Sequence, residues 1–298
     1  MQKNLEKYEI LDEETKKHGL ALQKDEITGY HLYERLSRST KDPHNKKVLK
    51  DIAEQELGHY HVLKTYTGRD VKSSKLTIWF YLFLSKIFGI TFAIKLMERG
   101  EEEFLVSYSK ISKSIPEVEA IIKDEEEHEK LLIDMIDEER LRYMDSMVLG
   151  LNDALVELTG MLAGLTLALQ DTQIIALVGL ITGIAASLSM ASSEYLSTKT
   201  EGGSRNPLRA SVYTGSSYIL TVLLLIFPFF LFTSIYFALG FTIFNAILII
   251  FIFTFYIAVT KELSFKKRFS EMATISLGIA AISFCIGYLI RIIFNVDI

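Results

Sequence analysis

Five apolar runs in the C-terminal half of the sequence constrain the fold most strongly, because each is long enough to cross the hydrocarbon core of a bilayer, about 30 Å thick. The runs lie at roughly 148–169, 173–196, 211–232, 235–259 and 272–294. Most Lys, Glu and Asp residues of the 298-residue chain precede them. We therefore predict an all-α protein with two domains, a soluble domain over residues 1–141 and a membrane domain with five spans over 148–298.

The composition excludes several other classes of protein. Cys285 is the only cysteine and lies inside an apolar run, so no disulfide can form within one chain. The net charge of −5 argues against nucleic acid as a partner, since phosphate binding requires a basic face. Residues 1–18 are charged and contain no apolar core of a secretory signal. We therefore expect the N-terminal domain to stay in the cytosol.

Basic residues between the runs predict the orientation of the membrane domain. Those in the loops after the second and fourth runs are Lys199, Arg205, Arg209, Lys261, Lys266, Lys267 and Arg268. The first and third loops contain no Lys or Arg. Because Lys and Arg mark the cytosolic ends of spans, we expect a cytosolic N-terminus and a C-terminus on the outer side. The expected location is the cytoplasmic membrane of a prokaryotic cell.

The stretch 76–97 is also apolar, but Lys86 and Lys95 interrupt it and Gly89 suggests a break. A crossing there would place the two halves of the motif set described below on opposite sides of the membrane, so a sixth span is not predicted. Two alternatives stay open: a buried connection between helices of the soluble domain, or a helix that lies in the membrane interface. In the second case the residues at the lipid headgroups would be Trp79, Phe80 and Tyr81.

Acidic side chains inside the first two spans indicate a path for ions. Asp153, Glu157 and Met161 recur every four residues and share one helix face, and Met190 and Glu194 have the same spacing. A carboxylate at bilayer depth costs at least ~2.5 kcal/mol, so such residues usually line an ion or proton path. Carboxylates with thioethers suit Fe(II) better than Mg²⁺ or Ca²⁺. Either methionine could instead fill the core, and Glu194 could be solvated at the interface.

The same segments carry a family resemblance. Residues 152–156 (Asn-Asp-Ala-Leu-Val), residues 189–197 (Ser-Met-Ala-Ser-Ser-Glu-Tyr-Leu-Ser) and Asn206-Pro207 before the third span resemble the signature segments of the vacuolar iron transporter family, the CCC-type transporters. The resemblance implies a homodimer of five-helix subunits that carries Fe(II), and often Mn(II), out of the cytosol in exchange for protons. The implied ion path lies at the dimer interface.

By this resemblance the ion-binding residues are Asp153, Met190 and Glu194, although Ser193 stands where the family has Gly. The sequence also departs from the plant-type members, which insert a Glu-rich metal-collecting domain between the second and third spans. Here only a short loop at about 198–210 connects them. Any metal-collecting function must therefore lie elsewhere in the chain.

Four helices are predicted in the soluble domain, at about 15–38, 43–66, 91–112 and 115–141. Asp42-Pro43 is typical of an N-cap followed by proline in the first turn, and residues 114–117 (Ser-Ile-Pro-Glu) fit a capping box. The longest connection falls between the second and third helices, as the crossover of a ferritin-like four-helix bundle requires.

An internal duplication indicates metal chemistry in this domain. Each repeat contains a Glu seven residues before a Tyr, and then a Glu-x-x-His motif. In order, the repeats contain Glu26, Tyr33, Glu56 and His59, and then Glu101, Tyr108, Glu125 and His128. Each Glu-x-x-His places a carboxylate and an imidazole on one helix face, and one Glu from each partner helix would complete a cage for two metal ions.

Residues 10–141 thereby resemble the rubrerythrin and ferritin-like di-iron proteins. The resemblance implies an iron cofactor, with manganese as the alternative, and six ligands: Glu26, Glu56, His59, Glu101, Glu125 and His128. Glu98, one turn before Glu101, resembles an additional rubrerythrin carboxylate that changes ligation on redox cycling, but it could also be a solvated residue. The Cys-x-x-Cys module of full rubrerythrins is absent from the sequence.

The sequence favours a transporter that exports Fe(II) in exchange for protons, with a cytosolic di-iron domain that binds or senses iron. No catalytic residue is assigned. One alternative is a di-iron ferroxidase or peroxidase whose spans are only an anchor, although an anchor has no use for buried carboxylates. A second alternative keeps transport but makes Mn(II) the cargo, which ligand chemistry cannot separate from Fe(II).

Overall fold

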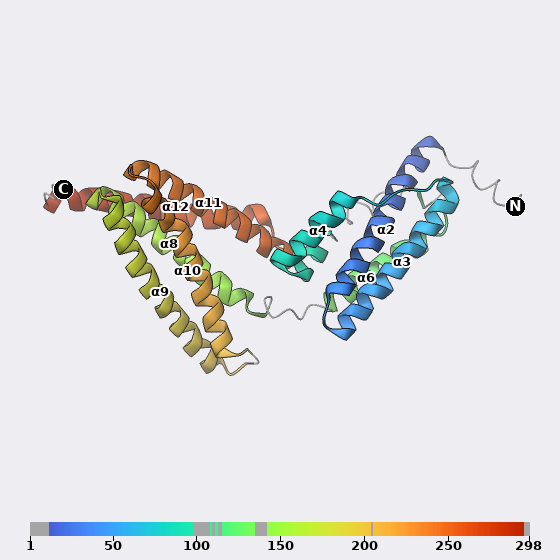
Figure 1. The fold of residues 1–298 in the computed structure, drawn as a ribbon, viewed down its shortest axis with the longest axis horizontal. Helices are drawn as coiled ribbons and strands as arrows, with labels where there is room; N and C mark the ends of the chain where they lie inside the picture. The colour runs from blue at the N-terminus through green and yellow to red at the C-terminus, as the bar shows by residue number, and fades with distance from the viewer. Residues whose placement is uncertain are drawn as a thin grey trace, which may run out of the picture. The chain divides into compact units, whose positions relative to one another are not determined.

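The computed structural model describes residues 12–97, 108, 111–112, 115–134, 142–203 and 205–294. Every regular element within these residues is a helix (Figure 1), which confirms the all-α class. The chain divides into two compact units, each with its own hydrophobic core. We name Met1–Glu138 the soluble unit and Glu139–Ile298 the membrane unit, after the domains that the sequence predicts. The ferritin-like four-helix bundle stays a prediction, because most of its predicted third helix lies outside the described residues.

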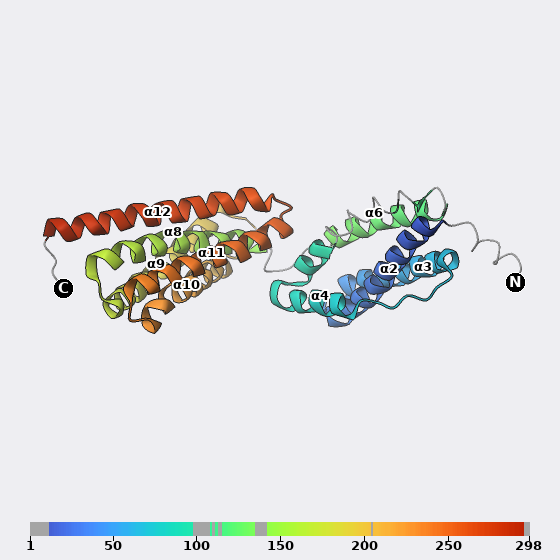
Figure 2. The same cartoon turned by 90° about the horizontal axis from the view of Figure 1, so that it is seen from above.

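The soluble unit is built on a helical hairpin of α2 (Glu13–Ser39) and α3 (Pro43–Thr67), which run side by side in Figures 1 and 2. The Asp12 carboxylate caps α2, and the Asp42 carboxylate accepts a hydrogen bond from the Asn45 backbone N–H at the start of α3. Proline in the first turn of α3 confirms the predicted start signal. Both helices extend slightly beyond the predicted ranges.

Helix α4 (Lys75–Phe88) occupies the connection that follows α3 and packs on α2. It begins at the Ser74 N-cap and ends at Gly89, whose φ of 97° confirms the expected break. Residues 90–97 are helical again. The alternative of a buried connection holds for one face of α4, where Ile78 and Leu84 are buried, but not for the opposite face, where Trp79 is 63% exposed.

Helix α6 (Val118–Asp134) packs on α3 and begins three residues later than predicted. The reason is that residues 115–117 form a turn before the helix starts. Ser114 of the predicted capping box lies outside the described residues, as do 98–107, 109–110 and 135–141 of the predicted third and fourth helices.

Two apolar clusters of the soluble unit enclose a polar zone. Along α2, Leu22 belongs to one cluster and Leu32 to the other, and Glu26 lies between them. Along α3, Ile52 and Leu63 likewise belong to different clusters and lie on either side of the Glu-x-x-His motif. Burial of these apolar groups fixes the two helices on both sides of the motif, and so holds its polar side chains in place.

The membrane unit contains the five helices that the sequence predicts as spans. They are α8 (Met144–Leu169), α9 (Thr172–Glu201), α10 (Pro207–Leu231), α11 (Ile235–Thr260) and α12 (Phe265–Phe294). All five are long and apolar enough to cross a membrane. Several start earlier than predicted because their first turns are polar: α8 contains Asp145, which pairs with Lys261, and α12 begins with a basic turn. The apolar run thus marks the part inside lipid rather than the helix ends.

Close backbone contact between α8 and α12 requires Gly287. A Cβ at this position would collide with the carbonyl oxygen of Gly164. We expect Gly287→Ala to destabilise the membrane unit by about 1–3 kcal/mol, the usual cost of overpacking. Thermal unfolding of the full chain in detergent measures the loss. Gly278→Ala in the same helix is the matched control, because a Cβ there meets no atom within 4 Å; equal losses in both variants would contradict the packing argument.

Candidate metal centre and membrane carboxylates

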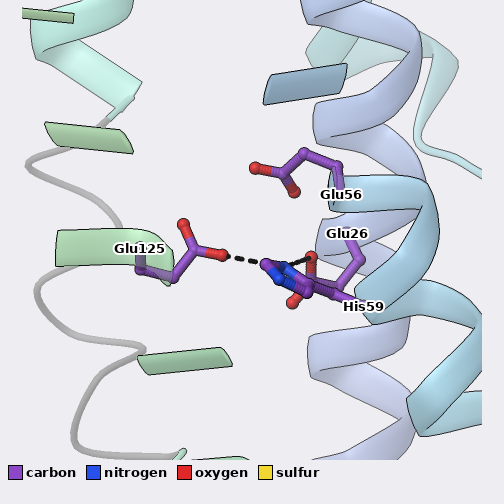
Figure 3. Close-up of side chains that lie close together, drawn as sticks. All are labelled: Glu26, Glu56, His59 and Glu125. Atoms are coloured by element: carbon purple, nitrogen blue, oxygen red, sulfur yellow. Dashed lines mark ion pairs between the residues drawn. The ribbon is translucent and has the colours of Figure 1, made fainter. Parts of the chain in front are cut away.

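Three helices of the soluble unit bring four predicted ligands together. Glu26 comes from α2, Glu56 and His59 from α3, and Glu125 from α6, and each offers one atom within 4.8 Å of the others. Figure 3 shows Glu125 approaching His59 from the side opposite Glu26. Among the described residues, this is the one group of three or more His, Cys, Asp and Glu side chains with such spacing. We call these four residues the carboxylate cluster.

His59 is the centre of this cluster. Its Nδ1 lies 3.3 Å from Glu26 Oε2 and 3.2 Å from Glu125 Oε1. Burial disfavours the charged imidazolium, but the close carboxylates of Glu125 and Glu26 outweigh it and raise the pKa of His59 to about 10. In the metal-free cluster a proton on His59 therefore balances part of the carboxylate charge.

Glu125 connects this group to the second imidazole. Its Oε2 lies 3.3 Å from Nδ1 of His128, which is buried and also lies 3.6 Å from Glu56 Oε1. Burial alone would raise the pKa of Glu125, but the close imidazoles of His128 and His59 outweigh it and lower this pKa to about 2. The two imidazole rings stack with centroids 5.9 Å apart. His128 thus lies beside the carboxylate cluster, as the duplication predicts for the sixth ligand.

The donor set fits a divalent transition metal. Carboxylate and imidazole ligands suit iron, manganese and zinc. Glu26 Oε2 and His59 Nδ1 are buried and make no hydrogen bond of acceptable geometry within the described residues. Leaving buried polar atoms unsatisfied costs roughly 1–3 kcal/mol each, and a cation placed between them would remove that cost. The residues present therefore fit the metal centre that the sequence predicts.

Gly29 makes room for the Glu56 carboxylate. A Cβ on Gly29 would lie 2.8 Å from Glu56 Oε2, closer than such atoms normally approach. The glycine lies one turn after Glu26 on α2, so the helix can present one carboxylate and accept another on the same face. Sequence analysis did not identify this residue, because a glycine inside a helix has many possible causes.

Tyr108 of the second repeat contacts the first repeat. Its hydroxyl donates a hydrogen bond to Glu26 Oε1. Burial, together with the negative charges of Glu26 and Glu125, raises the pKa of Tyr108 well above its usual value. Tyr108 is therefore a neutral donor that holds one oxygen of Glu26 and leaves the other directed at His59. The duplicated Glu-to-Tyr spacing was the signal for this tyrosine.

Two further side chains orient the imidazoles. His59 Nε2 lies 3.2 Å from Asp124 Oδ2, and His128 Nε2 lies 2.8 Å from Gln55 Oε1. Asp124 and Gln55 each stand immediately before the Glu of one Glu-x-x-His motif and contact the imidazole of the other motif. Sequence analysis missed both. The shared position before the motif was a signal, but only the packing of α3 on α6 shows that the contacts cross between motifs.

Asp124 should tune the metal affinity without being a ligand. A carboxylate that accepts a hydrogen bond from a ligating histidine fixes the ring and makes it more basic. Loss of that carboxylate typically weakens metal binding about 10- to 100-fold. The Asp124 side chain is 40% exposed, so we expect Asp124→Ala to fall near the lower limit. A metal titration should show weaker binding with an unchanged number of ions bound per chain. Glu126→Ala, which changes an exposed neighbour, is the control. A loss of binding sites, or equal effects of both variants, would refute this role.

Two predicted ligands, Glu98 and Glu101, lie outside the described residues. Their place in the centre stays a prediction. The remaining five predicted ligands of the soluble unit, Glu26, Glu56, His59, Glu125 and His128, all lie in the polar zone between the two apolar clusters.

In the membrane unit, α8 places Asp153 and Glu157 one turn apart, as predicted. Asp153 is half-buried, and Glu157 is exposed on the surface of the single chain. The hydroxyl of the buried Tyr218, on α10, donates a 2.7 Å hydrogen bond to Glu157 Oε2. One oxygen of Glu157 is therefore held by the helix bundle while the side chain still reaches its surface. Tyr218 is a residue that sequence analysis did not identify.

The two methionines lie partly buried against the core of the membrane unit. The sulfur of Met161 is 3.1 Å from the hydroxyl of Thr182 on α9. Met190 also packs on this core. Both positions agree with a methionine that packs in the core and with a thioether that lines an ion path, so both interpretations of these residues stay open.

Glu194 is buried and held by hydroxyl groups. Ser146 Oγ, at the start of α8, donates a 2.5 Å hydrogen bond to Glu194 Oε1, and Thr198 Oγ1 lies 3.4 Å from the same oxygen. Only 8% of Glu194 is exposed, so the alternative of a freely solvated residue is wrong in this structure. Glu194 instead connects the first turn of α8 with α9.

The membrane carboxylates form no cluster comparable to that of the soluble unit in a single chain. All residues of α8 and α9 are described. Among the described residues, Asp153, Glu157 and Glu194 belong to no group of three acidic, His or Cys side chains that could hold a metal ion. A complete cation site in the membrane would therefore need thioether, hydroxyl, water or second-chain ligands in addition.

Comparison with known proteins supports the first of the two resemblances. Curated proteins and solved structures gave no match to the chain. No family match covers the soluble unit. A match does cover α8 and α9, and with them Asp153, Glu157, Met161, Met190 and Glu194: the model of the VIT family matches residues 144–204.

Proposed function

We propose that the protein exports Fe(II) from the cytosol through its membrane unit in exchange for protons. The observation that carries the proposal is the pair Asp153 and Glu157 on an apolar helix, within the segment that matches the VIT family. That match supports a membrane metal-ion transporter. Iron as the cargo and protons as the counter-ion are the parts that we add from the chemistry of the side chains.

Exchange follows from the cost of bare charge in lipid. A carboxylate without a cation is expensive at bilayer depth, so it either holds a metal ion or takes up a proton. Asp153 and Glu157 would alternate between these two states as metal leaves toward one side and protons arrive from it. Tyr218 keeps one oxygen of Glu157 in place during both states.

A second copy of the chain completes the proposed path. Glu157 is exposed on α8, a helix apolar enough to cross a membrane, and a carboxylate on the surface of a span requires a polar cover. Two copies related by a two-fold axis would bring their Asp153 and Glu157 side chains toward a shared, water-accessible space. The homodimer would thereby supply the ligands that one chain lacks.

The soluble unit is proposed to bind iron before transport. Glu26, Glu56, His59, Glu125 and His128 would hold the metal, and a bound iron centre supplies redox chemistry. Among the chain's own residues, Tyr108 fixes one oxygen of Glu26, and Asp124 orients His59. Oxidation to Fe(III) would consume the Fe(II) cargo, so we favour binding or sensing. The positive-inside pattern supports a cytosolic location for this unit.

Metal flux in vesicles tests the proposal. The full chain is reconstituted, an inward or outward pH gradient is imposed, and Fe(II) uptake and internal pH are recorded together with dyes. We expect Fe(II) movement that is driven by the opposing proton gradient and is absent from protein-free vesicles. Fe(II) movement that is indifferent to the gradient would remove the antiport, and the absence of any metal movement would remove the transporter. Competition between Fe(II) and Mn(II) in the same assay identifies the preferred cargo.

A membrane-anchored ferroxidase or peroxidase is the second candidate. The buried carboxylate cluster beside the neutral phenol of Tyr108 favours it, because this is a residue set that iron redox chemistry can use. It predicts rapid peroxide-dependent formation of Fe(III) with no metal crossing the vesicle membrane. The first candidate predicts the reverse, so one vesicle experiment with both readouts separates them.

A further inference from the structure

One face of α4 is an exposed apolar stripe. Its residues follow the spacing i, i+3, i+4, i+7 of a single helix face: Leu76, Trp79, Phe80 and Phe83. They are 78%, 63%, 46% and 45% exposed, respectively, which is unusual for large apolar side chains that are adjacent. The rings of Trp79 and Phe83 stack on each other. We call this set the α4 stripe.

The opposite face holds α4 on the soluble unit. Ile78 and Leu84 are buried, and Tyr81 and Leu82 pack against the apolar cluster that contains Leu32. The Ser74 side chain caps the helix, and the Ser74 backbone N–H donates a hydrogen bond to Thr28 Oγ1 on α2. The helix is therefore fixed at its first turn and along its inner face, and it presents the α4 stripe outward as a formed surface.

Positive charge surrounds the α4 stripe. The segment 71–97 contains Lys72, Lys75, Lys86 and Lys95 and no Asp or Glu, although the whole chain has a net charge of −5. Lys72, Lys75 and Lys86 are exposed and form no ion pair among the described residues. Aromatic residues with flanking lysines are the composition of helices that lie in the headgroup region of anionic membranes.

We propose that α4 is a membrane-interface helix, which inserts the α4 stripe into the headgroup region of the bilayer and places its lysines at anionic lipid phosphates. The chain's own candidate spans tether the soluble unit to a bilayer, so the α4 stripe always meets the bilayer surface at a high effective concentration. A second copy is a poorer occupant, because a two-fold interface through α4 would bring like-charged lysines together without acidic partners. Docking of this kind would restrict how the soluble unit is presented to the membrane.

Trp79 reports on this proposal without any substitution, because it is the only tryptophan in the chain. The full chain is reconstituted in vesicles of phosphatidylcholine containing either no or one-third phosphatidylglycerol. In the anionic vesicles we expect a blue-shifted Trp79 emission, loss of most acrylamide quenching, and strong quenching by lipids brominated at shallow acyl positions. The measurement involves no metal, so its outcome is independent of the transport proposal.

Charge reversal supplies the matched pair of variants. Lys72, Lys75 and Lys86 changed together to Glu should restore acrylamide quenching in anionic vesicles. The control changes Lys41, Lys46 and Lys47 to Glu, which alters the net charge equally at exposed positions beside and on α3, and should leave Trp79 protected. Trp79 that stays open to acrylamide in every vesicle would overturn the proposal. Trp79 shielded from acrylamide but unaffected by brominated lipid would also overturn it, and would show that protein covers the stripe.

Discussion

Asp153→Asn is expected to lower Fe(II) flux through reconstituted vesicles about 10- to 100-fold, because a charge-assisted interaction worth roughly 1.5–3 kcal/mol is lost. Asparagine has nearly the same shape as aspartate but can neither neutralise a cation nor take up a proton. Because Asp153 is only half-buried, we expect this near-isosteric change to leave the fold intact. Flux is measured with equal amounts of protein that elutes as one species from size exclusion.

Asp171→Asn is the matched control for this experiment. Asp171 is the N-cap of α9, and its carboxylate accepts a hydrogen bond from the Ile174 backbone N–H. Asparagine caps a helix as well as aspartate does, so the same chemical change should leave flux unaltered. Equal flux in the wild type and Asp153→Asn would remove Asp153 from the path, and equal losses in both variants would indicate a general effect of charge.

Glu125→Gln is expected to reduce the metal bound by the soluble unit from about two ions per chain to one or none. Glu125 is the carboxylate that contacts both His59 and His128, so its loss affects the ligands of both proposed positions. The amide of glutamine cannot supply two negatively charged oxygens to the pair of imidazoles. Elemental analysis of the full chain after Fe(II) or Mn(II) loading and desalting measures the stoichiometry.

Glu127→Gln on the same helix is the control for metal binding. Glu127 is exposed and belongs to no cluster of ligands in the described residues, so its removal should leave stoichiometry unchanged. If Glu125→Gln retained the full complement of metal, the carboxylate cluster would not be the metal centre. If both variants lost metal alike, binding would reflect the overall acidity of α6 rather than a defined site.

The sequence predicted those features that depend on local patterns. Five apolar runs became five helices, because burial in lipid acts on each segment separately. Asp42-Pro43 predicted the start of α3, and the Glu-x-x-His spacing placed Glu56 beside His59 on one face. The structure also brings together Glu26, Glu56, His59 and Glu125, which the two copies of the motif share as predicted metal ligands.

Features that depend on packing between distant segments could not be predicted from the sequence. Asp124 contacts His59 across 65 positions of sequence, and Tyr218 contacts Glu157 across 61. Neither pair leaves a periodic signal. The direction of the α4 stripe was likewise open, because its composition suited both a buried connection and an interfacial helix. The structure shows which face of α4 packs on α2 and which face is exposed, and the interfacial helix stays a proposal.

Glu194 shows a limit of the argument from acidic residues in spans. The cost of a buried carboxylate predicts that it has a partner, but the partner can be a hydroxyl group as well as a cation. Ser146 and Thr198 satisfy Glu194 in this structure, whereas Tyr218 donates its hydrogen bond to Glu157, the neighbour of Asp153 on the next turn of α8. The central claim therefore rests on Asp153 and Glu157 rather than on every acid in the first two spans.

Anomalous scattering from crystals of the full chain grown with Fe(II) or Mn(II) tests that claim most directly. We predict one set of peaks within the carboxylate cluster and a separate peak within coordination distance of Asp153 or Glu157. Metal found only in the soluble unit, with water, lipid or protein donors around both membrane carboxylates, would contradict a cation path through the spans and would favour the anchored oxidase.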